Sequence, residues 1–408
     1  MSNVQEPRNG VVNLAFLEMQ PKRAEFLVFG APLIEEEEIR EVEATLRSGW
    51  LGTGPKTKLF EQRFAEYTGA KFAVALNSAT AGLHLALDAL GIGPGDEVIV
   101  PTMTFAATAN VVFHVGATPV FADCDPTTFN IDPASIAAAI TPRTKAIIPV
   151  HFAGRPCDMD AIMAIAQRHG LKVIEDAAHA TETWYKGRKV GTIGDVAAFS
   201  FYSTKNIVTG EGGMVTTNDP DLADAIRIRS LHGISRDAWK RYSTEGYQPY
   251  DCMYPGYKYN MMDLQASLGI HQLAKVDRFW ARRDQYWAMY NQGFASLPEL
   301  TLPPADEPDT KHARHLYTLI LDIDQLTVNR NEFVNLLKEE NIGSGVHFVA
   351  LHLHSLFRER LGTKRGDFPG SEYVSDRTIS LPLSPKLTEA DVQDVIAAVH
   401  RVIKRVRR

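Results

Sequence analysis

Between residues 71 and 217 the chain alternates short apolar segments with segments of helical periodicity. The apolar segments predict seven strands, at 72–76, 97–101, 118–123, 146–150, 172–176, 196–201 and 213–217. Between the first five strands, apolar residues recur every three or four positions, which is typical of amphipathic helices. Several of the predicted strands are apolar throughout, as expected for strands covered on both faces. The pattern therefore predicts an α/β fold, in which a mainly parallel sheet lies between two layers of helices.

The pattern differs at both ends of this region. A helix is expected from about Pro32, with acidic residues 35–38 in its first turn, where the helix dipole favours negative charge. Residues 262–295 predict one long helix that can bridge two domains. After Pro303 we expect a strand at HLYTLILDI, a helix at NRNEFVNLLKEEN, a strand or loop at GSGVHFV and a last helix from Glu389. The predicted parts are an N-terminal extension (1–27), a large domain (28–275) and a smaller C-terminal α+β domain (276–408).

Composition narrows the range of functions. The 408 residues include 43 basic and 49 acidic side chains, so the formal net charge is −6. Proteins that bind nucleic acid usually have a basic surplus, and this balance argues against such a role. The three cysteines are widely spaced, which favours a reducing compartment over a disulfide framework. The chain contains no apolar run near the roughly 20 residues of a membrane span and no signal-peptide pattern, so we expect a cytoplasmic protein.

Two segments at strand ends are candidates for binding chemistry. NSATAG (77–82) follows the first strand and opens a helix, so its backbone N–H groups could bind an anion. The alternative is a plain N-cap by Ser78 or Thr80. Asp176 ends an apolar strand, at the edge where open α/β sheets bind ligands. A carboxylate that only caps the next helix is an equal alternative, and strand alternation directs Glu175 to the opposite face.

The third candidate is Lys205, which follows another buried strand and precedes TGEGG, a segment interpreted as a turn. Lysine is usually a surface residue. Small polar neighbours beside an apolar strand can nevertheless lower the pKa of an amine and make it a nucleophile. An anion-binding helix start, a carboxylate and a lysine together match the needs of pyridoxal 5'-phosphate, namely its phosphate, its ring nitrogen and its aldehyde.

The sequence resembles the DegT/DnrJ/StrS family of pyridoxal-phosphate sugar aminotransferases, which have the fold-type-I aminotransferase architecture. The resemblance extends from about residue 28 to the C-terminus. It is carried by SGWLGTGPKTKLFEQRFA, NSATAGLHLAL, GDEVIVPTMTFAATAN, VIEDAAHA, FSFYSTKNIVTGEGGMVTTND and PGYKYNMMDLQASLG. Within the family, ITPRTKAIIPVHFAG, PGYKYN, GVHF and LPLSP resemble the enzymes that make UDP-4-amino-4-deoxy-L-arabinose.

The resemblance implies a role for each matching residue. Lys205 corresponds to the lysine that bonds to the cofactor and moves the proton, and Asp176 to the partner of the ring nitrogen. The other implied cofactor contacts are Ala79, Thr80 and Ser200 at the phosphate, Phe105 and His179 at the ring, and Lys258 in a loop that reaches the neighbouring subunit. His347 and Asn260 are expected at the substrate. Many members have GYNYR where this chain has GYKYN, and the arabinose enzymes have Trp at the position of Phe105.

We therefore expect a homodimeric aminotransferase with shared active sites, acting in glycan or lipopolysaccharide biosynthesis. It would transfer the amino group of L-glutamate to a nucleotide-linked 4-keto sugar and release 2-oxoglutarate. The alternatives are amination at carbon 3, a pyridoxal-phosphate-dependent sugar dehydratase and a non-catalytic regulatory protein. Dehydratases of this family have histidine at the position of Lys205. No metal site is expected, because His347, His352 and His354 have no acidic or cysteine partner at metal spacing, although the last two would share a strand face.

Overall fold

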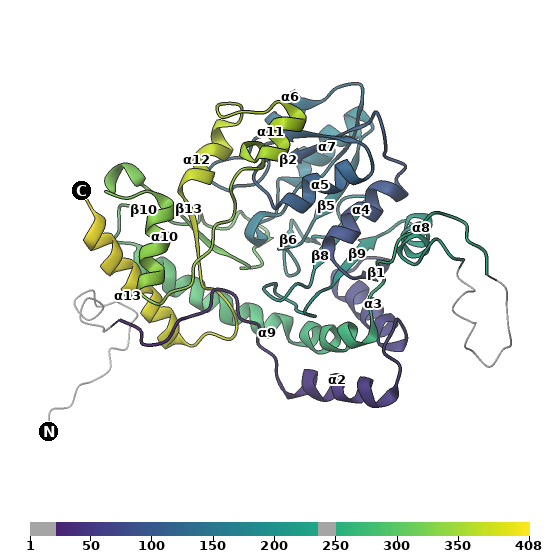
Figure 1. Ribbon diagram of the computed structural model, residues 1–408, viewed down its shortest axis with the longest axis horizontal. Helices are drawn as coiled ribbons and strands as arrows, with labels where there is room; N and C mark the ends of the chain where they lie inside the picture. Colours follow the sequence, from purple (N-terminus) through teal and green to yellow (C-terminus); the bar gives the residue numbers. More distant parts are fainter. Residues whose placement is uncertain (1–21, 236–249) are drawn as a thin grey trace.

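The computed structural model describes residues 22–235 and 250–408, and it has the predicted α/β architecture (Figure 1). Its central sheet has seven strands in the order β1-β9-β8-β5-β4-β2-β3. Their bounds are β1 Phe72–Leu76, β2 Glu97–Pro101, β3 Thr118–Ala122, β4 Thr144–Ile147, β5 Lys172–Asp176, β8 Val196–Ser200 and β9 Gly213–Thr217. Within this sheet, β9 is antiparallel to both of its neighbours, and the other six strands share one direction. The sheet is therefore mainly parallel, as predicted.

The predicted strand limits agree with the structure to within a residue for all strands but one. The strand predicted at 146–150 lies at Thr144–Ile147. Pro149 has no N–H to donate to the ladder, so regular pairing stops before it. Its carbonyl still accepts the N–H of Asp176 at 2.9 Å, which ties this segment to the end of β5.

Helices cover both faces of the central sheet, as the apolar strands predicted. One face is covered by α4 (Ala79–Ala89), α5 (Ala106–His114) and α8 (Pro220–Ser230). The other face is covered by α3 (Pro55–Thr68), α6 (Pro133–Ala139), α7 (Met159–His169) and the first part of α9 (Asp263–Phe294). In β5, Val173 packs on the α7 side and Ile174 on the α4 side. Full burial of such a side chain stabilises the fold by about 1.5–3 kcal/mol.

Helix α2 (Glu36–Ser48) begins four residues after the predicted start at Pro32. Glu35 is its N-cap, and the acidic residues at 36–38 occupy its first turn. These carboxylates also contact the long helix, because Lys275 of α9 lies 2.8 Å from Glu35 and Glu38 and 2.9 Å from Glu37. The acidic run therefore both complements the helix dipole and fixes α2 against α9.

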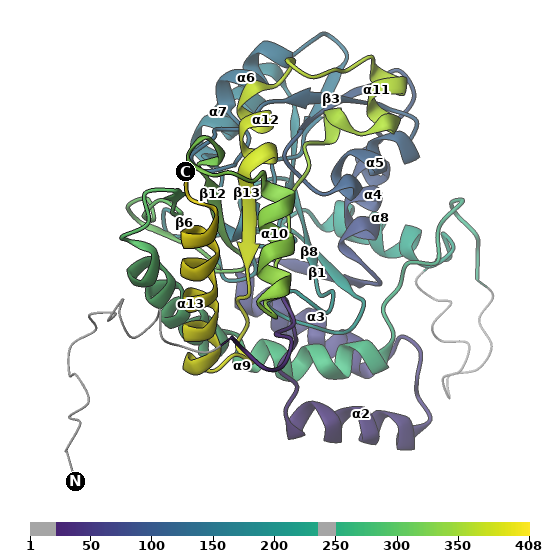
Figure 2. The same ribbon diagram turned by 60° about the vertical axis from the view of Figure 1, so that its left-hand side comes forward.

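The C-terminal elements form a second layered unit around an antiparallel sheet. This sheet has the order β10 (Leu300–Thr301), β12 (Tyr317–Leu321) and β13 (Thr378–Leu381). Helices α10 (Arg330–Glu339) and α13 (Glu389–Val406) lie beside it, and α13 also packs on the second part of α9 (Figure 2). The predicted strand and both predicted helices are confirmed, and GSGVHFV is a loop with one bridge, from Gly345 to Ser380. The predicted boundary between residues 275 and 276 falls inside α9 and stays a prediction.

Shorter elements complete the described chain. A small sheet is formed by β11 (Thr310–Lys311), β6 (Trp184–Tyr185) and β7 (Arg188–Lys189). The remaining elements are α11 (Ser355–Leu361), α12 (Pro369–Arg377) and the 3₁₀ turns η1 (Phe152–Gly154), η3 (Ile323–Gln325) and η4 (Leu351–Leu353). Of the helices in the described residues, none is long and apolar enough to span a membrane. Leu27, assigned to the predicted extension, is buried in the C-terminal core.

Candidate active site

A cavity of about 360 Å³ opens at the carboxyl edge of the parallel strands. Eight of the ten residues predicted for the site line it: Ala79, Thr80, Phe105, Asp176, His179, Ser200, Lys205 and His347. They come from the ends of β5 and β8, the start of α4, the residue before α5 and three loops. The fold therefore gathers residues that are up to 268 positions apart in the chain, from Ala79 at the start of α4 to His347 in a loop of the C-terminal elements.

The start of α4 forms one wall of the cavity. Ser78 is the N-cap, and its Oγ accepts the N–H of Ala81 at 3.1 Å. The N–H groups of Ala79 and Thr80 lie in the first turn, where a helix offers no carbonyl partner. The backbone of Gly213 in β9 lies so close behind this turn that a Cβ there would be 2.5 Å from the nitrogen of Ala79. The N-cap interpretation of NSATAG is therefore confirmed for Ser78, and anion binding by the N–H groups of its neighbours stays a prediction.

Asp176 also lines the cavity and is 5% exposed. Its Oδ2 accepts the hydroxyl of Thr108 at 2.8 Å, and its Oδ1 accepts the N–H of Ala178 at 3.1 Å. Burial raises the pKa of the carboxyl group, while these hydrogen bonds and the charge of Lys205 act in the opposite direction. Glu175 points to the other face, as expected, where the N–H of Gly194 donates to it at 2.9 Å.

Lys205 lies in a turn after β8, closed by its N–H donating to the carbonyl of Tyr202 at 2.8 Å. Burial lowers the pKa of its amine to about 8, and the nearby Asp176 only partly offsets this effect. A substantial fraction of the amine is therefore neutral and nucleophilic in mildly alkaline solution.

Two neutral histidines line the cavity. The Nδ1 of His179 accepts the N–H of Ala153 at 3.2 Å, so its ring hydrogen resides on Nε2. The Nδ1 of His347 lies 2.8 Å from the hydroxyl of Ser380. Burial, followed by repulsion from Lys205, keeps the pKa of His179 well below its usual range and lowers that of His347 to about 4. Neither ring adds positive charge beside Lys205.

Residues 32–400 match the model of the DegT/DnrJ/EryC1/StrS aminotransferase family. The chain belongs to this family. It is 54% identical over 387 residues to the spore coat polysaccharide biosynthesis protein SpsC of Bacillus subtilis, covering 95% of this chain and 99% of SpsC. The PLP form of Spr1654 from Streptococcus pneumoniae superposes with a TM-score of 0.86 at 36% identity, over 93% of this chain and 99% of Spr1654. The sugar aminotransferase CalS13 from Micromonospora echinospora superposes with a TM-score of 0.81 at 29% identity, over 91% of this chain and 99% of CalS13.

The protein is therefore a pyridoxal-phosphate-dependent aminotransferase of the sugar aminotransferase family. The chemistry of the cavity fits that cofactor. The N–H groups at the start of α4 and the hydroxyl of Ser200 can bind the phosphate of the cofactor. The carboxylate of Asp176 suits its ring nitrogen, and the amine of Lys205 suits its aldehyde. The volume also falls in the range of roughly 300–1,000 Å³ that is usual for small-ligand pockets.

Two residues predicted for the site of this aminotransferase lie outside the cavity of their own chain. Lys258 and Asn260 occupy a loop beside the end of β1, where the carbonyl of Tyr259 accepts the N–H of Asn77 at 2.7 Å. The ammonium group of Lys258 donates to Oδ1 of Asn260 at 2.7 Å, and the amide of Asn260 donates to Thr53. Their roles at the cofactor of a neighbouring subunit and at the substrate stay predictions.

The cavity also contains residues that were not predicted: Thr104, Thr108, Tyr202, Thr204, Glu211 and Phe348. Thr104 and Thr108 are four positions apart in PTMTFAATAN, and their hydroxyls lie 2.9 Å apart. The hydroxyl of Thr108 also donates to Asp176. Two threonines four positions apart at the start of a helix were therefore a pattern from which this part of the site could have been predicted. TGEGG is a turn, as interpreted, yet its Glu211 and Gly212 line the cavity.

The expected strand that would place His352 and His354 on one face is wrong. His352 lies in η4, and His354 is the residue that precedes α11. The ring of His352 is buried between Thr102, at 2.7 Å, and Glu372, at 3.0 Å. It therefore links the end of β2 to α12 and has a structural role.

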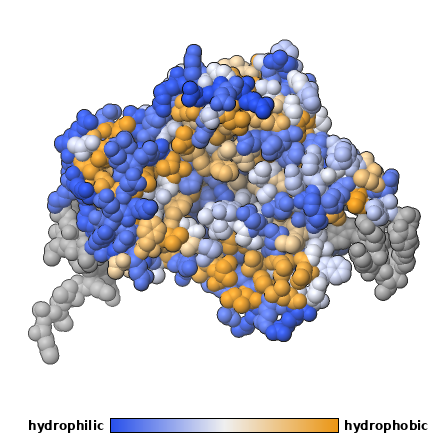
Figure 3. Space-filling model, viewed as in Figure 1, coloured by the Kyte–Doolittle hydropathy of each residue, from blue (hydrophilic) through white to orange (hydrophobic). Residues whose placement is uncertain are grey.

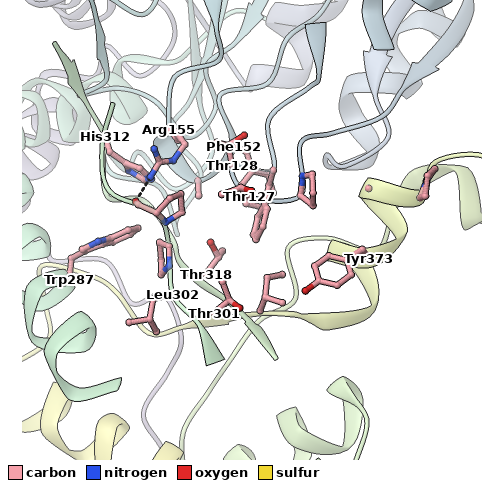
Figure 4. A pocket seen from close by; sticks show the side chains of 18 residues that line it. Thr127, Thr128, Phe152, Arg155, Trp287, Thr301, Leu302, His312, Thr318 and Tyr373 are labelled. Carbon is pink, nitrogen blue, oxygen red and sulfur yellow. Dashed lines mark hydrogen bonds between the residues drawn. The ribbon is translucent and has the colours of Figure 1, made fainter. Parts of the chain in front are cut away.

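A second cavity of about 550 Å³ lies between the C-terminal sheet and loops of the central sheet (Figure 4). Aromatic rings line it, with Arg155 and His312 at one end and Tyr373 at the other (Figure 4). The guanidinium of Arg155 already donates to Glu307 at 2.8 Å and to the carbonyl of Pro304 at 2.6 Å. None of the predicted site residues of the aminotransferase lines this cavity. The smaller cavity is therefore the candidate active site.

Proposed function

We propose that this aminotransferase transfers the amino group of L-glutamate to carbon 4 of a nucleotide-linked keto sugar. The observation that carries the proposal is the placement of Lys205, with its amine pKa near 8, in one cavity with the buried Asp176. The identity with SpsC supports a sugar product for polysaccharide synthesis. The presence of lysine at this position opposes the dehydratase alternative. The low cysteine content supports a cytoplasmic location.

The side chains around the cavity have different roles in this reaction. Bound pyridoxal phosphate supplies an electron sink next to the carbon that loses or gains a proton. The buried carboxylate of Asp176, oriented by Thr108, keeps a proton on the ring nitrogen. The first N–H groups of α4 and the hydroxyl of Ser200 bind the phosphate. Lys205 removes a proton from the reacting carbon of glutamate and later returns one to the sugar carbon, which requires an amine with a pKa near the working pH.

We also propose that the active unit is a homodimer. Apolar side chains that stand exposed on and beside α2 form what we term the α2 surface: Ile39, Leu46, Trp50, Leu51 and Met262. Much of the area over α2 is apolar in Figure 3. Phe105, 63% exposed, leaves an apolar ring uncovered at the cavity itself. A second subunit on the α2 surface would cover these groups and bring a loop such as the one with Lys258 to the partner's cavity.

An absorbance experiment tests the donor half of the reaction. Purified protein is loaded with pyridoxal phosphate, and its visible band is recorded before and after L-glutamate is added without an acceptor. We expect the band to disappear while 2-oxoglutarate is released in an amount equal to the number of sites. Lys205→Ala should form no such band and release no product, whereas Lys145→Ala, which alters an exposed lysine, should behave as wild type. A band that ignores glutamate would contradict the proposed donor.

The acceptor position requires a second measurement. Protein that has reacted with glutamate is mixed with nucleotide-linked sugars that have a keto group at carbon 4 or at carbon 3. We expect an amine at carbon 4, located by NMR of the product. Turnover of the 3-keto sugar alone would refute the assignment of carbon 4 and leave the transaminase activity intact.

A further inference from the structure

A series of buried polar side chains connects α9 to the residue next to Lys205. Arg283 of α9 donates to Glu182, and their side chains are 1% and 0% exposed. The other carboxylate oxygen of Glu182 accepts the amide N–H of Asn206 at 2.7 Å. The same amide nitrogen donates to the carbonyl of Ala313 at 3.0 Å. Two acceptors therefore fix the orientation of the Asn206 amide.

The orientation of Asn206 determines the tautomer of His315, whose ring contacts that of His179. Because its nitrogen faces Glu182, its Oδ1 faces Nδ1 of His315, at 2.9 Å, and can only accept. His315 thus carries its hydrogen on Nδ1. Its ring packs against that of His179, with centroids 4.4 Å apart. His179 in turn lines the active-site cavity.

We propose that Asn206 is a positioning residue that, anchored through Glu182 to Arg283, holds Lys205 and the His315–His179 pair in place around the cavity. This inference rests on the proposed role of Lys205. Asn206 follows Lys205 directly in the chain, so its side-chain bonds fix the backbone from which the amine extends. These bonds reach two segments that are far away in the sequence, at Glu182 and at 313–315.

The surroundings show how Asn206 acts on Lys205. Lys205, Asn206 and Arg283 line one small cavity of about 20 Å³. Truncation of Asn206 would enlarge this space beside Lys205 and leave polar partners that can bind water. Water beside Lys205 favours its charged form, so the pKa of the amine would rise from about 8 towards its ordinary value of 10.5.

The test uses the full chain without cofactor, so that it does not depend on activity. The pH dependence of labelling of Lys205 by trace acetic anhydride is followed by mass spectrometry. In wild type we expect a midpoint near pH 8. In Asn206→Ala we expect it to rise by about one unit or more. If the alanine variant does not fold, Asn206→Ser replaces it. The serine hydroxyl is too short to reach Glu182, Ala313 and His315 together, so we expect the midpoint to rise in this variant as well.

Asn291→Ala is the matched control. Asn291 lies in the same helix as Arg283 and accepts the hydroxyl of Tyr317 at 2.8 Å. Its loss should lower stability and leave the midpoint of Lys205 unchanged. In the loaded enzyme, Asn206→Ala should slow the glutamate half-reaction by about tenfold or more with little change in the half-saturating glutamate concentration.

A midpoint that stays near 8 in the folded Asn206 variants would overturn the inference and leave Asn206 a purely structural role. Failure of the proposed function looks different. In that case wild-type protein would not react with glutamate, although labelling of Lys205 would still respond to Asn206.

Discussion

Replacing Gly213 by alanine is expected to remove most of the affinity for pyridoxal phosphate. A Cβ at this position in β9 would lie 2.4 Å from the carbonyl carbon of Ser78 and 2.5 Å from the nitrogen of Ala79. Carbon atoms in contact prefer roughly 3.5–4.0 Å. Both obstacles are backbone atoms, which no rotamer change can clear. The first turn of α4 must therefore move by roughly 1 Å relative to β9.

The expected loss of affinity in Gly213→Ala follows from the N–H donors in the first turn of α4. The phosphate is expected to accept the N–H groups of Ala79 and Thr80. A hydrogen bond to a charged group contributes about 1.5–3 kcal/mol. Loss of both bonds corresponds to roughly 3–6 kcal/mol, or an affinity lower by about two to four orders of magnitude.

The assay is a titration of cofactor-free protein with pyridoxal phosphate, combined with urea unfolding of the same cofactor-free protein. Gly93→Ala is the control, because its added Cβ would meet only the carbonyl oxygen of Val115, at an ordinary 3.7 Å. It should bind the cofactor as wild type does. A folded Gly213→Ala protein whose affinity stays within about threefold of wild type, a difference well below 1.4 kcal/mol, would refute the reasoning.

Two further predictions concern stability. Lys189 is 5% exposed, with its ammonium 2.9 Å from the ring centroid of Tyr67, and burial lowers its pKa to about 7. The unfolded chain, with the ordinary value of 10.5, binds more protons between these two values. Stability should therefore rise from pH 7 to 10.5, by up to about 1.4 kcal/mol per pH unit from this group. In Lys189→Met, urea unfolding at several pH values should show a flatter slope, and an unchanged slope would contradict the assignment. Asp263 of α9 is buried and accepts the N–H groups of Gly54, at 2.8 Å, and Thr57, at 2.9 Å. Asp263→Ala leaves these donors without a partner and should destabilise the protein by about 3 kcal/mol or more, measured by urea unfolding. A loss below about 1 kcal/mol would show that water replaces the carboxylate.

The fold was largely predictable, because its strands are short apolar runs with polar or glycine-containing ends. The segments at 72–76 and 97–101 match their strands at every residue. The direction of β9 was not predicted, although the chain holds a clue. The connection at 201–212 contains no helical pattern, and parallel strands usually need a crossover that includes a helix. The start of α2 was placed too early because Pro32 is a common first residue of helices, whereas Glu35 is the actual cap.

The two cavity residues proposed to act on the cofactor, Asp176 and Lys205, were easier to predict than the groups that orient such side chains. Asp176 and Lys205 follow buried strands, and this position is visible in the sequence. Thr108 and Ala153 act through hydrogen bonds to residues 68 and 26 positions away, and such pairs leave no local pattern. Asn206 illustrates both cases. Its position next to Lys205 is visible in the sequence, but its hydrogen-bond partners lie in other segments and could not be predicted.

The composition of the C-terminal core has a consequence for synthesis on the ribosome. Leu27, from the start of the described chain, is buried in one cluster with Ile403 and Val406 of α13. The central sheet is complete once residue 217 has been made, and it can assemble while translation continues. The C-terminal core must wait until α13 has been made, so the apolar side of the second part of α9 stays uncovered until then. Nascent chains that stall shortly before α13 should consequently be the form of this protein that chaperones bind most strongly.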